Sequence, residues 1–117
     1  MAIKVYQYPK CSTCRKALKW LDAKNVSYDS IDITVTPPKK AELQRALKSG
    51  IALKKLFNTS GQSYRDGKWG ERLGSTTESQ ALEALASDGK LVKRPFIVTD
   101  SGVTVGFDEA VFEKTYK

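Results

Sequence analysis

Residues 8–16 read Tyr8-Pro9-Lys10-Cys11-Ser12-Thr13-Cys14-Arg15-Lys16 and contain both cysteines of the chain, separated by two residues. The residues before this segment, from Ile3 to Tyr8, are typical of a strand, and those after it, from Ser12 to Lys24, are typical of a helix. A Cys-x-x-Cys pair between a strand and a helix is typical of proteins that carry out thiol–disulfide chemistry. The segment therefore predicts a redox site.

This chemistry needs one sulfur as a thiolate, because the thiolate is the nucleophile and a free cysteine has a pKa of about 8.5. Cys11 is expected at the helix start, where unpaired N–H groups and the helix dipole favour an anion. Lys10, Arg15 and Lys16 add positive charge nearby. Cys14 lies one helical turn further on, within reach of a mixed disulfide on Cys11. We therefore predict that Cys11 attacks and that Cys14 resolves the mixed disulfide.

Two other interpretations of the cysteine pair compete with this one. A structural zinc site usually needs four Cys or His ligands. The chain has two cysteines and no histidine, so we expect no metal site within one chain, and only a site shared across a dimer stays open. The other interpretation is that both cysteines fill the core by chance. The positive flanks and the strand-to-helix context favour redox chemistry over it.

Length and composition limit the kind of protein. With 117 residues and 40% hydrophobic residues, residues 1–117 are expected to form one globular domain. No apolar run approaches the roughly 18 residues of a membrane span. The sequence enters a strand at Ile3 without a secretion signal, which indicates a cytoplasmic protein. A cysteine pair there is more often catalytic or redox-sensing than structural.

The formal net charge of +7 suggests affinity for anions or for acidic protein surfaces. The lysines are spread along the chain and form no basic arm, and no basic strand carries interleaved aromatic residues that could stack on bases. We therefore expect no direct binding to nucleic acid and no binding to membranes.

Taken in order, the pattern predicts an α/β fold. Residues 28–33 alternate as a second strand, which completes a strand–helix–strand unit with parallel strands. Residues 37–87 are expected to form a helical insertion. Residues 96–99 and 103–105 flank a short turn and form an antiparallel hairpin, and a last helix follows Asp108. The result is a thioredoxin-like, four-stranded mixed sheet flanked by helices, with the insertion between its two halves.

The sequence also predicts where the helices begin and end and which faces they bury. Thr36 is expected to cap the first inserted helix, with Glu42 on its outer face, and Gly50 is expected to end it in a left-handed conformation. Ser75 and Glu78 have the spacing of a capping box for a later helix. For the last helix we expect Asp108 as N-cap and a buried face of three residues: Ala110, Val111 and Phe112.

The sequence resembles the arsenate reductase/Spx family of thioredoxin-like proteins, and is closest to its small uncharacterised reductase-like members. The matching segments are spread over essentially the whole chain: 8–17, 56–61, 91–95 and 105–109. The resemblance implies a cis peptide bond before Pro95, which brings Arg94 to the cysteine loop. There Arg94 would stabilise the Cys11 thiolate or grip an oxyanion. Pro95, Lys10, Ser12 and Thr13 would shape the substrate groove.

The resemblance leaves three functions to weigh. Arsenate reductases of this family hold the oxyanion with three arginines, of which only Arg94 is matched, while Asn58 stands where another is expected and Arg65 cannot be placed. The Spx branch uses its Cys-x-x-Cys pair as a redox switch in a regulator that binds the RNA polymerase α subunit, and Gly50 matches a glycine of that contact. Our first hypothesis is a thiol–disulfide oxidoreductase without a bound cofactor. Its electrons would come from glutathione, glutaredoxin or thioredoxin.

Overall fold

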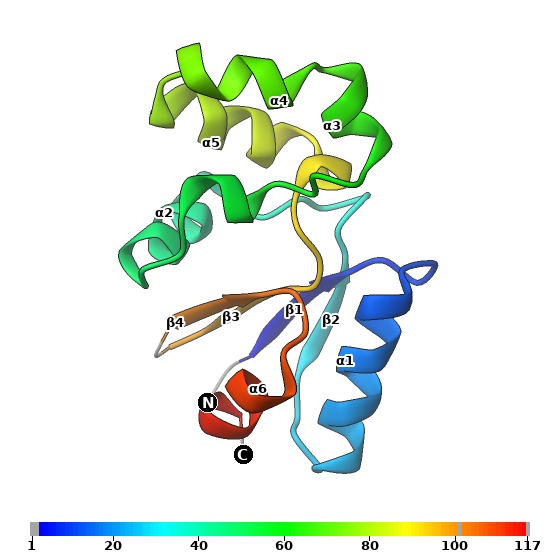
Figure 1. Cartoon of the computed structure of the whole chain (residues 1–117). Coiled ribbons are helices and arrows are strands. Elements are labelled where there is room, and N and C mark those ends of the chain that lie inside the picture. The colour runs from blue at the N-terminus through cyan, green and yellow to red at the C-terminus, as the bar shows by residue number, and fades with distance from the viewer. Residues whose placement is uncertain (1–2, 101, 117) are drawn as a thin grey trace.

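The computed structural model describes residues 3–100 and 102–116, and within them the chain forms one mixed sheet. The strands are β1 (Lys4–Gln7), β2 (Asp29–Asp32), β3 (Phe96–Thr99) and β4 (Gly102–Val105). Their order is β2-β1-β3-β4, with β1 parallel to β2 and with β3 antiparallel to both β1 and β4 (Figure 1). The predicted four-stranded mixed sheet of a thioredoxin-like α/β fold is confirmed.

Helices lie on both faces of this sheet. Helices α1 (Ser12–Ala23) and α6 (Glu109–Thr115) cover one face, and the segments between β2 and β3 are stacked over the other (Figure 1). Those segments are α2 (Lys40–Lys48), η1 (Leu53–Leu56), α3 (Gln62–Asp66), α4 (Trp69–Arg72), η2 (Leu73–Ser75), α5 (Glu78–Ser87) and η3 (Gly89–Leu91). None of the helices in the described ranges combines the length and the apolar character that crossing a bilayer demands.

Two hydrophobic clusters follow from the alternation of side chains along the strands. Val5 and Ile97 face α1 and α6, where they pack with Leu21 and Phe112. Their strand neighbours Tyr6, Phe96 and Val98 face the inserted helices and pack with residues such as Leu43, Leu56 and Leu85. The sheet is therefore buried on both sides, which fixes the loops at its ends.

Local signals at the helix ends were partly confirmed. Gly50 adopts a φ of 96°, and the next residue, Ile51, donates its N–H to the carbonyl of Ala46, so the predicted left-handed ending of α2 is present. Asp108 caps α6 as predicted, because its carboxylate accepts the N–H of Ala110 at 3.0 Å.

Three details at the helix ends were wrong. Helix α2 begins after Lys39 and not after Thr36, since Pro37 precedes another proline and therefore avoids the helical conformation. The capping box of α5 joins Thr77 and Gln80, two residues after the predicted position. In α6, Phe112 is buried, but Ala110 and Val111 are exposed.

Glu42 was expected on the outer face of α2 and is instead buried. Its carboxylate accepts a hydrogen bond of 2.7 Å from the Tyr6 hydroxyl and one of 3.0 Å from the backbone N–H of Lys39. A carboxylate can be buried when such partners satisfy it. This contact fastens α2 to strand β1.

The insertion is also tied to the segment that leads into β3. Phe57 and Val92 form an isolated antiparallel bridge, flanked by bonds from the N–H of Asn58 to the Leu91 carbonyl (2.7 Å) and from the N–H of Lys93 to the Leu56 carbonyl (2.8 Å). Just before this bridge, Gly89 lies directly against the end of β2. A Cβ on Gly89 would stand 1.6 Å from the carbonyl oxygen of Ile33.

Because no side chain fits there, we predict that Gly89→Ala forces the two segments apart and lowers the free energy of unfolding by about 1–3 kcal/mol. Gly74→Ala is the matched control, since a Cβ on Gly74 meets nothing within 4 Å. Urea denaturation of both variants measures the difference. Equal stabilities would show that the close approach of Gly89 to Ile33 is unimportant.

Candidate active site

Cys11 occupies the N-cap position of α1, where its extended backbone (φ −90°, ψ 117°) points the side chain back over the first turn. Its Sγ accepts the backbone N–H of Cys14 at 3.3 Å. The loop is closed on the other side by a 3.0 Å bond from the N–H of Cys11 to the carbonyl of Tyr8. The sulfur thus takes the place that a Ser, Thr or Asp oxygen usually fills at a helix start.

The two cysteines differ in exposure. Cys11 is partly exposed, Cys14 is fully buried, and both are free thiols. Over residues 3–100 and 102–116, no three Cys, His, Asp or Glu side chains gather as a metal site would require.

Burial disfavours the charged form of Cys11, but hydrogen bonds and charge outweigh it, so the pKa of the Cys11 thiol lies below its ordinary value. The thiol and the backbone N–H of Cys14 contribute most, followed by the positive charge of Arg94. The backbone N–H of Thr13 adds a smaller contribution. Burial together with the neighbouring Cys11 sulfur raises the pKa of the Cys14 thiol. The pair therefore divides into one sulfur that ionises readily and one that stays protonated.

Arg94 is brought to this loop by the segment before β3. The Arg94–Pro95 peptide bond is cis, as the family resemblance implies. The guanidinium carbon of Arg94 stands 5.1 Å from the centroid of the Tyr8 ring, and this cation–π contact lies beside the cysteine loop. Arg94 and both cysteines, which the sequence separates by about eighty residues, meet at one end of the sheet.

The other predicted site residues differ in exposure. Lys10 and Ser12 are exposed, Thr13 is half-buried and Pro95 is buried. Arg15 and Lys16, which were expected to add positive charge, are exposed on α1, and the side-chain charge that acts on Cys11 is that of Arg94.

A small cleft of about 230 Å³, lined mainly by residues with polar or charged side chains, lies next to Arg94. It is lined by Tyr8, Asn58, Gly61, Gln62, Ser63, Lys90 and Arg94. Arg65, which the sequence left unplaced, is not among them: it is exposed and borders a different hollow with Thr59 and Glu71.

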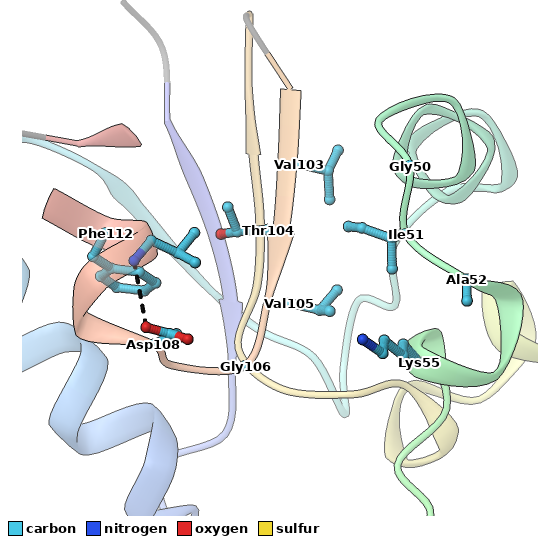
Figure 2. Close-up of a pocket in the computed structure, with 11 residues that line it drawn as sticks. Gly50, Ile51, Ala52, Lys55, Val103, Thr104, Val105, Gly106, Asp108 and Phe112 are labelled. Carbon is cyan, nitrogen blue, oxygen red and sulfur yellow. Dashed lines mark hydrogen bonds between the residues drawn. The ribbon is translucent and has the colours of Figure 1, made fainter. Parts of the chain in front are cut away.

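A larger hollow, of about 370 Å³, lies away from the cysteines, between the end of α2, strand β4 and helix α6. Figure 2 shows Ile51, Val103 and Val105 directed into this space, with Lys55 at its border and Gly50 at its rim. It contains no cysteine, so it takes no direct part in thiol chemistry.

Sequence reasoning missed Lys90, Gln62 and Ser63 as neighbours of the site. No motif marks them, because the bridge between Phe57 and Val92 is what brings their segments together. The signal that could have found Lys90 is weak: a cation four residues before Arg94, in the segment that carries the proline.

Comparison with known proteins identifies the family of this chain. The ArsC family profile matches residues 6–115. Uncharacterized protein YusI of Bacillus subtilis is 48% identical over 99% of both chains. A global transcriptional regulator Spx from Streptococcus agalactiae is 25% identical over 92% of this chain and 77% of the regulator.

Solved structures give the same result. An ArsC family related protein from Bacteroides fragilis superposes with a TM-score of 0.92 and 43% identity, covering 97% of each chain. A possible arsenate reductase from Streptococcus mutans superposes with a TM-score of 0.90 and 41% identity, covering 97% of this chain and 98% of the other. With a Cys-x-x-Cys pair at the start of α1 and a cis-proline loop beside it, this chain belongs to the ArsC family.

Proposed function

We propose that this chain is a thiol–disulfide oxidoreductase in which Cys11 is the nucleophile and Cys14 the resolving thiol. The observation that carries the proposal is the position of the Cys11 sulfur: it is accessible, caps α1 at 3.3 Å from the N–H of Cys14, and lies within the field of Arg94. These contacts favour the thiolate, which is the reactive form.

In the first step the Cys11 thiolate attacks one sulfur of a disulfide R–S–S–R. A bond forms between the Cys11 sulfur and that substrate sulfur, the S–S bond of the substrate breaks, and R–S⁻ leaves. The hydrogen bonds that hold the Cys11 thiolate lower its basicity but leave it a sufficient nucleophile, because the best attacking thiols have a pKa near the ambient pH.

In the second step Cys14 loses its proton to solvent and attacks the Cys11 sulfur. The Cys11–Cys14 disulfide forms and the second R–S⁻ leaves, so the substrate gains two electrons and the cysteine pair loses two. Once Cys11 is bonded to R its negative charge is gone, which removes one of the causes that keep Cys14 protonated. The different pKa values of the two thiols thus favour attack by Cys11 first and by Cys14 second.

The oxidised pair then needs two electrons from a thiol. Glutathione, glutaredoxin or thioredoxin would supply them by the same exchange in reverse. The partly exposed sulfur of Cys11 is where each donor would attack, since Cys14 is fully buried.

The similarity to a possible arsenate reductase makes arsenate a second candidate substrate. The cleft next to Arg94 is lined by no other arginine, with Asn58 where a second would be needed to grip a tetrahedral oxyanion. Disulfide exchange requires no such grip, and we therefore favour it.

The similarity to Spx supports a further candidate, a redox-switched regulator that binds the RNA polymerase α subunit. A pull-down with the isolated α subunit, under reducing and oxidising conditions, tests it. On our account the polymerase subunit is not retained in either state. Retention that depends on the redox state of the cysteines would favour the regulator instead.

The activation of Cys11 predicts a pH profile. The rate of alkylation of Cys11 by iodoacetamide should reach half its maximum at a pH below the ordinary pKa of a cysteine, because hydrogen bonds and the Arg94 charge favour the thiolate. In Arg94→Gln the profile should move to higher pH, since a favourable charge is lost. Arg65→Gln, the same chemical change at an exposed arginine, should leave it in place. An unshifted profile in Arg94→Gln contradicts the role of Arg94.

The separate roles of Cys11 as nucleophile and Cys14 as resolving thiol predict that an intermediate can be trapped. Cys14→Ser should react with a small disulfide and accumulate a stable mixed disulfide on Cys11, because no second thiol can displace it. Intact-mass spectrometry should show the added R–S group in this variant and, in the unaltered chain, loss of two hydrogens. Cys11→Ser should show neither product. A mixed disulfide that accumulates equally in the unaltered chain would remove Cys14 from its role.

A further inference from the structure

We infer that the polar cleft beside Arg94 is a carboxylate-binding subsite, which selects acidic low-molecular-weight thiols and disulfides as partners of Cys11, with Lys90 as its specificity-determining residue. This inference rests on the proposed thiol–disulfide exchange and adds the chemical class of the partner. Nothing in the exchange chemistry itself requires Lys90.

The cleft is positively charged. Six of the seven residues that line the cleft have side chains able to donate a hydrogen bond, the exception being Gly61, and none is acidic. Its two cations, Lys90 and Arg94, form no ion pair among the described residues. Two unneutralised cations at one cleft create a positive potential, which attracts an anion.

Two residues connect the cleft to the cysteine loop. Tyr8 and Arg94 line the cleft, and both also belong to the cysteine loop region: the Tyr8 carbonyl accepts the N–H of Cys11, and the Arg94 charge acts on the Cys11 sulfur. A ligand bonded to Cys11 through sulfur can therefore place another of its groups in the cleft.

Hydrogen bonds and packing contacts hold the walls of the cleft in place. Asn58 and the segment after Lys90 are joined through the Asn58 N–H and the Leu91 carbonyl at 2.7 Å. The Asn58 amide is packed against the turn below it, since a Cβ on Gly61 would stand 2.6 Å from its Nδ2. The backbone N–H of Lys90 is held by the Asp88 carboxylate at 3.0 Å, so the base of the lysine is anchored while its side chain is exposed.

The size and shape of the cleft suit a small ligand group. A cleft of about 230 Å³ lies below the roughly 300–1,000 Å³ of sites that enclose a drug-sized ligand. It suits one arm of a small thiol, with a planar carboxylate that an arginine and a lysine can share. A tetrahedral oxyanion would call for more than one fork-shaped donor, and Arg94 is the one guanidinium lining the cleft.

The inference is tested by the charge of the substrate. The full-length protein is reacted with three symmetrical disulfides at low ionic strength: 3,3′-dithiodipropionate, which is anionic, bis(2-hydroxyethyl) disulfide, which is neutral, and cystamine, which is cationic. Acid-quenched samples are followed by intact-mass spectrometry. Each rate constant is divided by that of the same disulfide with a small reference thiol, which removes differences in intrinsic reactivity.

We expect the unaltered chain to prefer the anionic disulfide over the neutral one, and the neutral one over cystamine. Lys90→Gln should lower the rate with the anionic disulfide about fivefold and leave the rate with the neutral one unchanged. Lys90→Arg should restore the preference. Lys19→Gln removes the same charge from the exposed side of α1, away from the cleft, and should change neither rate. The preference should shrink as salt is added.

Three results would overturn the inference. If Lys90→Gln slows the anionic and neutral disulfides equally, Lys90 acts on the fold or on Cys11 and not on the substrate. If it behaves as Lys19→Gln does, only the overall charge matters. If none of the disulfides reacts faster with the protein than with the reference thiol, the proposed oxidoreductase function fails as well, and the subsite has no substrate to select.

Discussion

One hydrogen bond, from the backbone N–H of Cys14 to the sulfur of Cys11, joins the fold to the chemistry. It places the sulfur at the start of α1, orients it toward solvent and supplies part of the stabilisation that a thiolate needs. It also explains why the two cysteines differ: the residue that donates this bond is carried into the core by the first turn of the helix, where its own thiol is buried and stays protonated. Their spacing along α1 thus makes Cys11 the accessible cysteine with the lowered pKa and Cys14 the buried cysteine with the raised pKa.

The second constraint is long-range. Arg94 reaches the cysteine loop because β3 pairs with β1, which leaves the proline segment at the same end of the sheet as α1. The inserted helices are joined to that segment by the bridge between Phe57 and Val92. This bridge closes the cleft that contains Lys90. The insertion, although far from the cysteines in sequence, therefore contributes one wall of the region where a substrate would bind.

The parts of this arrangement that could be predicted from the sequence are those set by local chemistry. The two-residue cysteine spacing before a helix, the glycine at position 50 and the capping Asp108 act within a few residues, and each was found as expected. Helix starts were less predictable where prolines compete, as at Thr36. The face of a short helix was also misjudged at Val111, because seven residues give too little periodicity to show which side meets the sheet. Lys90 could not be predicted, since only tertiary pairing brings it to the cleft.

The positions of the two sulfurs on α1 lower the pKa of the Cys11 thiol and raise that of the Cys14 thiol. Labelling both cysteines with ¹³C at Cβ and titrating the reduced protein by NMR reports each sulfur separately. The account predicts that the Cys11 signal titrates below the pH range of an ordinary cysteine and the Cys14 signal above it. Two signals that titrate together in the ordinary range, or a Cys14 that ionises first, would contradict it.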